Sequence, residues 1–466
     1  MSRTTARRRA YVETYGCQMN VSDGELMEGV LAAGGYEIVR RPEDADVVLV
    51  NTCAIREHAE KRVLGRVAQL NGLKTERPDL IIGVTGCMAQ RMGESLLREA
   101  PYVDLVMGPD GYRALPGSLE RLGAVRARAD GVASTPDAPA RERRQLSVLD
   151  LHPAENYDGL EQRRTEGPSA WVPIQRGCDH RCTFCIVPYV RGGEKNRRAL
   201  DVVAEVEGLV ERGVSEVTLL GQTVNSYRWE DVTFADLLRR VARVPGVRRV
   251  RFTSPHPNDV TAELVEAMAD ERAVCEHLHL PAQSGSDRTL KRMLRRYTVE
   301  DFLEKVEMVR KAIPDIAIST DIIVAFPGES DAEFRDTLAL VRAVRFDEAY
   351  TYKYSLRDGT PAARLPREDF VPGDEAQARL EELIDVSRGI QAEINRAEVG
   401  RVEEVLIEKP ARHDGQVLGR TRRNKVVVFD GDSARVGEYA RVELQRTTGA
   451  TFAGAGTDVA AAAVTV

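Results

Sequence analysis

The sequence predicts an α/β protein with three domains: an N-terminal parallel-sheet domain, a central partial (β/α) barrel, and a small C-terminal antiparallel β-barrel. Three observations lead to this prediction. Short β-rich runs alternate with helix-compatible stretches twice, first up to about residue 125 and again from Trp171. After Gly400 the alternation gives way to short strands separated by Gly and Asp turns. At 466 residues the chain also exceeds what one hydrophobic core usually serves.

Composition and charge narrow the class of protein. Apolar residues make up 42% of the chain and charged residues 30%, as in ordinary soluble globular proteins. The longest apolar runs, such as Val47 to Val50, are far shorter than the roughly 20 residues of a transmembrane helix. The basic N-terminus MSRTTARRRA lacks the apolar stretch of a secretory signal. We therefore expect a cytoplasmic protein without a membrane partner. Because the net charge is -7, any nucleic-acid binding requires a local basic patch.

The first region repeats one pattern three times: a β-rich run, a cysteine, and a stretch compatible with a helix. The runs AYVETYGC, ADVVLVNTC and LIIGVTGC end at Cys17, Cys53 and Cys87. This alternation predicts a parallel sheet, because a right-handed crossover returns each strand in the same direction. The three thiols then lie at the C-terminal ends of strands, where open α/β sheets bind ligands. The alternative interpretation is three buried structural cysteines.

The second region follows a segment, residues 120 to 166, whose Ala, Arg, Asp and Pro content indicates a linker with room for one strand. Strands are then expected near WVPIQ, EVTLLG, VRRVRFTS, EHLHLP, AISTDIIVAF and AYTYKYS, separated by helical stretches such as DVVAEVEGLVER and DAEFRDTLALVRAV. About six βα units predict an open or partial barrel with its site at the C-terminal strand ends. A helix from about Glu375 to Ala397 closes this region.

The remaining sequence predicts a small barrel and a tail. Strands are expected at RVEEVLIE, KVVVFD and ARVELQ, whereas the final GTDVAAAAVTV has little to order it and is expected to fray. The predicted boundaries are 10–125 for the N-terminal domain, 126–165 for the linker, 166–397 for the central barrel, 399–455 for the C-terminal barrel and 456–466 for the tail.

Three further cysteines form a C-x3-C-x2-C motif directly after the first barrel strand. Cys178, Cys182 and Cys185 lie within eight residues, so their thiolates can hold one 4Fe-4S cluster and leave one iron open, as catalytic metal sites do. The motif resembles the signature of the radical S-adenosylmethionine (SAM) superfamily. In that superfamily SAM chelates the open iron, and electron transfer into its sulfonium releases a 5′-deoxyadenosyl radical. The alternatives are a structural zinc knuckle or an electron-transfer cluster, for which His180 would be a poorly placed fourth ligand.

A longer resemblance runs in order from about Tyr11 to Phe429. It is carried by TYGCQMNVSDGE, NTCAIREHAEKR, TGCMAQR, RGCDHRCTFCIVPYVRGGE, LLGQTVNSY, LHLPAQSGSD, DIIVAFPGES and YSLRDGTPAA. Together these segments resemble the methylthiotransferase family of radical SAM enzymes, which has an N-terminal domain with an auxiliary 4Fe-4S cluster, a radical SAM barrel and an RNA-binding TRAM barrel. The resemblance implies two 4Fe-4S clusters and SAM as cofactors. The implied ligands are Cys17, Cys53 and Cys87 for the auxiliary cluster, and Cys178, Cys182 and Cys185 for the cluster that binds SAM.

Within the family, TYGCQMN and AIREHAE resemble the branch that acts on isopentenyladenosine in tRNA. The sequence departs from the family pattern at two places. Ala325 stands in DIIVAFPGE where the family usually has Gly, and Asn196, Arg197 and Arg198 stand where Ser and Arg-Pro are usual. A methyl group at Ala325 would either crowd a bound SAM or fill a gap, so we assign this position no binding role.

Seven further residues are candidate contacts for SAM or substrate. The ring of Phe184 could pack on the SAM adenine, or it could belong to the loop core. The backbone of Gly192 and Gly193 with the Glu194 carboxylate could hold the SAM amino group, or form a turn with a capping acid. The last three follow predicted strands at the rim, where hydrogen bonds within loops are the alternative; they are Gln222, Asn225 and Ser284. We expect His256, His277, His279 and Cys275 to be structural.

A basic segment lies in the last domain. Between residues 409 and 425 only Asp414 opposes six positive charges, which could neutralise RNA phosphates; a solvated basic hairpin is the alternative. The six residues are Lys409, Arg412, Arg420, Arg422, Arg423 and Lys425.

The resemblance implies an enzyme that replaces an aromatic C-H of a tRNA adenosine with S-CH3. The expected substrate is isopentenyladenosine next to the anticodon, in a loop base that is flipped out of the stack. The expected partners are the tRNA anticodon stem-loop and an electron donor such as flavodoxin or ferredoxin, and the protein is expected to be a monomer. The alternatives are action on threonylcarbamoyladenosine tRNA, action on an Asp of a ribosomal protein, and a non-catalytic iron-sulfur protein that binds RNA. No residue is assigned as an acid, base or nucleophile.

Overall fold

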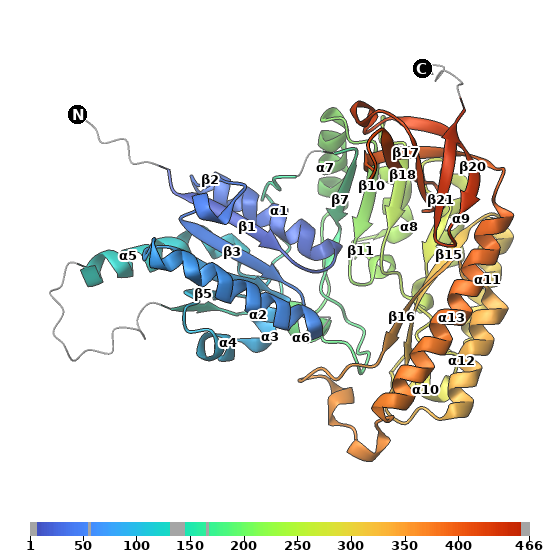
Figure 1. Cartoon of the computed structure of the whole chain (residues 1–466), viewed down its shortest axis with the longest axis horizontal. Coiled ribbons are helices and arrows are strands. Elements are labelled where there is room, and N and C mark those ends of the chain that lie inside the picture. Colours follow the sequence, from blue (N-terminus) through green and yellow to red (C-terminus); the bar gives the residue numbers. More distant parts are fainter. Residues whose placement is uncertain (1–6, 55–56, 131–144, 165–166, 458–466) are drawn as a thin grey trace. The chain divides into compact units, whose positions relative to one another are not determined.

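The computed structural model describes residues 7–54, 57–130, 145–164 and 167–457 (Figure 1). The chain forms two compact units. The first comprises Met1–Thr165, Arg176–His180 and Ile186–Lys195, and the second comprises Glu166–Gln175, Arg181–Cys185 and Asn196–Val466. Among the described helices, none combines the length and apolarity needed to cross a membrane.

The first unit is built on a six-stranded sheet with the order β2-β1-β3-β4-β5-β6. Its strands are β1 (Arg9–Thr14), β2 (Glu37–Ile38), β3 (Val47–Thr52), β4 (Ile81–Gly86), β5 (Leu105–Met107) and β6 (Leu146–Val148). Every neighbouring pair is parallel. The central strands β3 and β4 are buried on both faces, as strands of a covered parallel sheet are.

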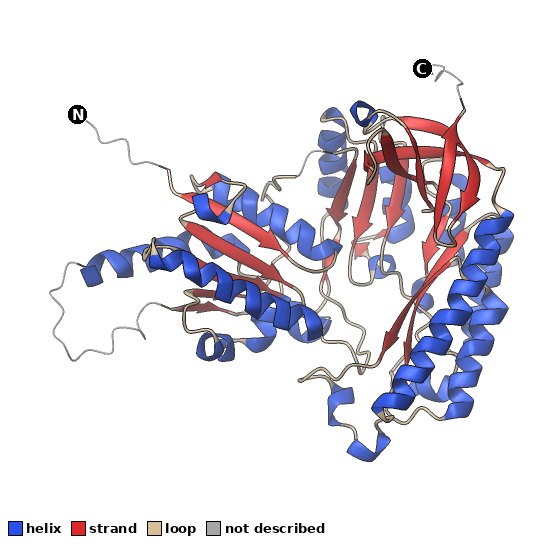
Figure 2. Ribbon diagram, in the orientation of Figure 1, coloured by secondary structure: helices blue, strands red, loops and turns tan. Residues whose placement is uncertain are grey.

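Helices cover both faces of this sheet (Figure 2). On one face α1 (Gln18–Ala33) and α5 (Leu115–Asp130) contribute Leu26 and Leu119 to the core. On the other face lie α2 (Glu57–Asn71), α3 (Cys87–Met92) and α4 (Glu94–Glu99). Along β3, Leu49 belongs to the first core and Val50 to the second, because successive side chains of a strand point to opposite faces.

The second unit begins with a partial barrel of parallel strands. One half has the order β13-β10-β7 and the other β14-β15-β16, and a bridge between Val250 and Val274 joins the halves. The strands are β7 (Ser169–Pro173), β10 (Glu216–Leu220), β13 (Arg249–Phe252), β14 (His277–His279), β15 (Ala317–Val324) and β16 (Glu348–Lys353). All six strands expected from the second alternation are therefore present.

Helices pack against these strands around a large apolar core. They are α7 (Ala199–Glu211), α8 (Phe234–Ala242), α9 (Ala262–Asp270), α10 (Asp287–Arg292), α11 (Val299–Ala312), α12 (Asp331–Val344) and α13 (Gly373–Ala397). The helices α8, α11 and α12 begin with a capping box, in which a hydroxyl residue and an acid three positions later satisfy the free N-H groups. The N-caps are Thr233, Thr298 and Ser330.

Short elements lie around the cysteine-rich loop and after β10. They are β8 (Gln175–Arg176), α6 (Val187–Arg191), β9 (Lys195–Asn196), β11 (Arg228–Trp229) and β12 (Val232–Thr233). The strands β8 and β9 pair with each other, as do β11 and β12.

The C-terminal strands form a closed barrel with the order β17-β18-β19-β21-β20. They are β17 (Val402–Pro410), β18 (Gln416–Thr421), β19 (Val426–Asp430), β20 (Tyr439–Thr447) and β21 (Thr451–Gly456). The barrel is antiparallel as predicted except for the pair β19-β21, which is parallel. A Cβ at Gly419 would lie 2.2 Å from the carbonyl oxygen of Leu406, so β17 and β18 approach as closely as they do only with glycine there.

The predicted linker and tail are described only in part. The strand expected within the linker is β6, which joins the N-terminal sheet, and α5 continues to Asp130. Residues 131–144 of the linker and 458–466 of the tail lie outside the described residues. The domain boundaries given above stay a prediction.

Candidate metal centres and cofactor site

Cys17, Cys53 and Cys87 follow three adjacent strands of the N-terminal sheet. Cys17 is the N-cap of α1 after β1, Cys53 follows β3, and Cys87 begins α3 after β4. Since β1, β3 and β4 are parallel neighbours, the three residues lie at one edge of the sheet, as the sequence predicted.

The two loops that carry Cys17 and Cys53 touch each other. Gly16 has φ +133°, and a Cβ on it would lie 2.5 Å from the Cβ of Cys53, so only glycine permits this approach. A hydrogen bond from the Cys53 thiol lowers the pKa of the Cys17 thiol to about 6, against the opposing effect of burial. Burial raises the pKa of the Cys87 thiol, and the negative charge of Cys17 is among the further causes. Through these interactions Cys53 affects the pKa of Cys17, and Cys17 affects the pKa of Cys87.

Asn20 joins the loops that follow β1 and β3. Its Nδ2 donates to the carbonyl oxygen of Thr52 at 2.9 Å, and its own carbonyl accepts from Asn51 Nδ2 at 2.7 Å. The Cys17 thiol donates to Asn20 Oδ1 at 3.2 Å. Asn20 and Asn51 are fully buried, so these hydrogen bonds fix the backbone that presents the cysteines.

Cys178, Cys182 and Cys185 lie in the loop between β8 and α6, whose residues divide between the two units. In the first unit, Cys178 N donates to the carbonyl oxygen of Gly192 at 3.2 Å. In the second unit, Cys185 N donates to the carbonyl oxygen of Cys182 at 3.0 Å, and Arg295 Nη1 lies 3.4 Å from Cys182 Sγ. The sequence therefore predicted the loop correctly but missed the buried Arg295 beside it.

The turn at Gly192 and Gly193 lies against the start of the cysteine loop. A Cβ at Gly177 would lie 1.9 Å from the carbonyl oxygen of Gly193, so the chain segments pass here in direct contact. Asp179 Oδ1 accepts from the backbone N-H of Glu194 at 3.1 Å, so an acid outside the predicted set caps this turn. Phe184 packs with Met293 and Phe326 in a small apolar cluster, the loop-core alternative. A contact of these four residues with SAM stays a prediction.

The three candidate residues at the barrel rim differ in whether their side chains already have hydrogen-bond partners. Both ends of the Asn225 amide are used by the backbone of His256, at 2.9 and 2.7 Å. Ser284 Oγ accepts from the backbone N-H of Ser286 at 3.2 Å and lies 3.4 Å from Thr337 Oγ1. Gln222 differs, because its buried Oε1 has no hydrogen-bond partner among the described residues. A buried acceptor without a donor is a position for a ligand N-H or O-H.

Gln283 is a rim residue that sequence reasoning missed. Its Oε1 is also buried and without a partner in the described structure, and its backbone is left-handed at φ 66°. Ser254 (φ 56°) and Ala325 (φ 57°) have the same conformation just after β13 and β15. Left-handed non-glycine residues store strain of about 1–3 kcal/mol, and three of them at neighbouring strand ends mark a shaped rim. The unusual Ala325 was a signal in the sequence for one of them.

The residues expected to be structural make internal contacts. His256 Nδ1 accepts from Asn258 N at 3.2 Å. His277 and His279 both lie at hydrogen-bond distance from Ser319 Oγ, at 3.2 and 3.0 Å. Burial and the charge of Arg251 lower the pKa of His277 well below its ordinary value. Cys275 is buried.

Three of the six residues predicted to contact RNA form ion pairs with other residues of the chain. Arg422 Nε lies 2.7 Å from Glu276 Oε2, and Arg423 Nη2 lies 2.7 Å from Glu403 Oε1. Lys425 Nζ lies 2.7 Å from Asp347 Oδ1. These pairs place the basic hairpin against the central barrel and the start of its own domain, so a surface of six free cations is not what the fold presents.

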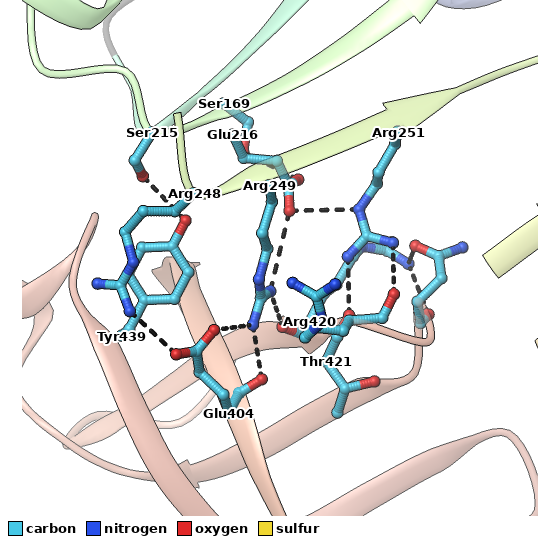
Figure 3. A network of polar contacts seen from close by, with 12 residues as sticks. Ser169, Ser215, Glu216, Arg248, Arg249, Arg251, Glu404, Arg420, Thr421 and Tyr439 are labelled. Carbon is cyan, nitrogen blue, oxygen red and sulfur yellow. Dashed lines mark hydrogen bonds and ion pairs between the residues drawn. The ribbon is translucent and has the colours of Figure 1, made fainter. Parts of the chain in front are cut away.

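Figure 3 shows the polar contacts between the central barrel and this hairpin. From β13, Arg249 donates to the carbonyl oxygens of Arg420 and Glu404, at 2.8 and 2.7 Å. Arg251 donates to the carbonyl oxygen of Thr421 at 2.8 Å. The remaining predicted RNA contacts are more accessible: Lys409 and Arg412 are exposed, and Arg420 is half-exposed with Glu408 at 3.2 Å.

The donor sets fit iron-sulfur clusters. Each site offers three cysteines, and thiolates are the ligands that such clusters use. Three protein ligands leave the fourth position open to another group. At the barrel rim the buried acceptors of Gln222 and Gln283 fit a ligand that carries amino and hydroxyl donors, as SAM does.

Three family models match the chain in the order of the predicted domains. The model described as uncharacterized protein family UPF0004 matches residues 9–108, the radical SAM superfamily matches 172–341, and the TRAM domain matches 396–454. Among solved structures, the radical SAM methyltransferase TsrM from Kitasatospora setae has a TM-score of 0.54 at 14% identity, covering 77% of each chain. At that identity the likeness shows the fold.

Curated relatives match nearly the full length. A tRNA-2-methylthio-N(6)-dimethylallyladenosine synthase from Chloroherpeton thalassium is 42% identical over 449 residues, covering 96% of this chain and 95% of the relative. Relatives of the same name from Thermoanaerobacter sp. and Moorella thermoacetica are 45% and 44% identical, covering 95% of this chain and 92% and 96% of theirs. The resemblance found in the sequence is confirmed: the chain is a radical SAM enzyme of the methylthiotransferase type and belongs to the family of tRNA-2-methylthio-N(6)-dimethylallyladenosine synthases.

Proposed function

We propose that this protein adds a methylthio group to N(6)-dimethylallyladenosine, the isopentenyladenosine expected above, next to the anticodon of tRNA. The observation that carries the proposal is the placement of Cys17, Cys53 and Cys87 on three neighbouring strand ends, in addition to the radical SAM motif. Radical generation needs one three-cysteine site. A second such site supplies an open position for the sulfur that this reaction transfers.

The chain's own residues hold and orient the reactants. Cys178, Cys182 and Cys185 would ligate the cluster that binds SAM, and Cys17, Cys53 and Cys87 the auxiliary cluster. Bound there, clusters and SAM supply radical chemistry for an aromatic C-H bond that has no acidic proton and no leaving group. The buried Gln222 and Gln283 oxygens would accept hydrogen bonds from SAM or substrate. Phe184, Gly192, Gly193 and Glu194 would be further contacts for SAM.

RNA binding falls to the C-terminal barrel, since phosphate contacts position a substrate without activating it. The exposed Lys409 and Arg412, with the half-exposed Arg420, are the side chains of the predicted set that can reach phosphates. Arg422, Arg423 and Lys425 support this surface indirectly, by holding the hairpin in place.

The proposal has three further features. The enzyme requires an outside one-electron donor, such as flavodoxin or ferredoxin, and works as a monomer in the cytoplasm. The names of the full-length relatives favour N(6)-dimethylallyladenosine over threonylcarbamoyladenosine or a ribosomal Asp as the target.

A three-substrate assay tests the proposal. Reconstituted enzyme receives reductant and SAM with dimethylallylated tRNA, unmodified tRNA or ribosomal protein, and products are identified by mass spectrometry of nucleosides and peptides. We expect 2-methylthio product on the dimethylallylated tRNA, because an apolar prenyl group gives the site a handle for discrimination. Product on ribosomal protein alone would refute the tRNA substrate. Equal product on unmodified tRNA would support the proposed reaction but contradict the requirement for a prenyl group.

A further inference from the structure

A buried ion triad lies beside the cysteines of the first unit. The carboxylate of Asp23, in α1, accepts from Arg176 Nη1 at 2.5 Å and from Arg191 Nη2 at 2.7 Å. The three side chains are at most 5% exposed. All three residues belong to the same compact unit as Cys17, Cys53 and Cys87.

This triad carries one surplus positive charge in a buried environment. Two guanidinium groups oppose one carboxylate, and burying an uncompensated charge costs several kcal/mol. Arg176 also lies over the ring of Tyr157, with 4.7 Å to the ring centroid. Arg191 instead directs its Nε at Cys87 Sγ, at a distance of 3.1 Å. The surplus charge therefore faces the cysteine site.

A hydrogen bond and a positive charge at a ligand sulfur act on the redox properties of a bound cluster. Reduction adds one negative charge, and both interactions stabilise that more negative state. Their effect is large in a buried site, because little water is present to screen them. Residues that contact ligands in this way commonly tune a metal site without ligating it.

We propose that Arg191, positioned by Asp23, raises the reduction potential of the cluster held by Cys17, Cys53 and Cys87. The proposal rests on the ligand assignment made in the proposed function. Arg191 is a positioning residue here, since it acts through Cys87.

The test measures one cluster alone. In full-length protein carrying Cys178→Ala, Cys182→Ala and Cys185→Ala, only the auxiliary site can load iron. The midpoint potential of its cluster is measured by redox titration with EPR detection, at equal iron content. Arg191→Gln should make the one-electron reduction at least tenfold less favourable, a shift of about 59 mV to more negative potential. Arg191→Lys retains the charge and should restore part of the shift.

Asp23→Asn separates electrostatic tuning from structural damage. It removes the negative charge of the triad but keeps a side-chain oxygen that can accept from Arg191, so Arg191 stays in place and the potential should move in the opposite, positive direction. Arg98→Gln, on the exposed face of α4 in the same unit, removes an equal charge at the surface and should leave the potential unchanged. Opposite shifts in the Arg191→Gln and Asp23→Asn proteins are the expected result.

Two outcomes would overturn the proposal, and they can be told apart. Loaded Arg191→Gln and Asp23→Asn proteins with unchanged potentials, or with shifts of the same sign, would refute the role of Arg191 alone. Failure of the three-alanine parent to bind iron would refute the ligand assignment, and the tuning role with it.

Discussion

Arg422 and Glu276 form a bidentate ion pair between the C-terminal barrel and the central barrel. Arg422 Nε lies 2.7 Å from Glu276 Oε2, and Arg422 Nη2 lies 2.8 Å from Oε1. The same Nη2 donates to the carbonyl oxygens of Arg272 and Val274. This guanidinium is occupied inside the chain, whereas Lys409 and Arg412 on the same barrel are exposed.

The two kinds of basic residue should therefore respond differently to replacement. Lys409→Ala with Arg412→Ala should weaken tRNA binding and reduce the slope of log K against log salt by roughly 0.9 for each duplex phosphate that the protein no longer neutralises. Arg422→Ala should instead lower the free energy of unfolding by about 1–3 kcal/mol, less than for a fully buried pair because Glu276 is partly exposed. Filter binding at several salt concentrations and urea unfolding measure the two effects. A folded Arg422→Ala protein with a reduced salt slope would contradict this division.

The two cysteine triads should have separable roles. Replacing Cys17, Cys53 and Cys87 by Ala should remove one cluster, by iron analysis, yet leave reductive SAM cleavage to 5′-deoxyadenosine. Cys182→Ala should abolish cleavage. Cys275→Ala, at a buried cysteine outside both triads, should retain both clusters and cleavage. Normal cleavage by the Cys182→Ala protein would place the radical site elsewhere.

Ala325→Gly should stabilise the protein. The backbone of Ala325 is left-handed at φ 57°, which costs a Cβ-bearing residue about 1–2 kcal/mol and glycine almost nothing. Two costs reduce this gain: the variant buries one methyl group less, and glycine gives the unfolded chain more conformational freedom. We therefore expect the free energy of unfolding to rise by about 0.5 kcal/mol. The same change at the exposed helical residue Ala339 should cost about 1 kcal/mol. Chemical denaturation measures both, and a loss at Ala325 equal to that at Ala339 would show that its conformation is not strained.

Stability should fall in mild acid because of His277. Burial and the charges of Arg251, His279 and Lys425 hold the pKa of His277 well below its value of 6.5. As the pH falls below 6.5, the unfolded chain therefore binds a proton that the folded chain does not. This contribution to stability is present above that pH and is lost at up to about 1.4 kcal/mol per pH unit.

Denaturation of His277→Gln between pH 7 and pH 5 checks this assignment. The variant should be less stable at pH 7, since it alters the contact with Ser319, but its stability should depend less on pH. His413→Gln, at an exposed histidine, should keep the pH dependence of the parent. Equal slopes in all three proteins would assign the effect to other groups.

Local patterns in the sequence were enough to predict the strands and the placement of the cysteines. Strand runs such as ADVVLVNTC and AISTDIIVAF formed β3 and β15, because buried parallel strands need unbroken β-branched and apolar residues. The convergence of Cys17, Cys53 and Cys87 also followed from sequence, since parallel connectivity brings the ends of neighbouring strands together. The closing parallel pair β19-β21 was not predicted, because strand direction in a small barrel depends on long-range pairing.

The sequence by itself determined the α/β class, the two cysteine triads and the family, because strand periodicity, cysteine spacing and ordered motifs are local properties of a chain. Only the tertiary structure decided which charged residues are free. Lys425 and Arg412 are equivalent cations in the sequence, yet Asp347, distant along the chain, holds the first while the second is exposed. Likewise, Asp23 in α1 and Arg191 in α6 are distant along the chain and meet only in the folded protein. The partner of a charge depends on contacts between distant segments, which no local pattern records.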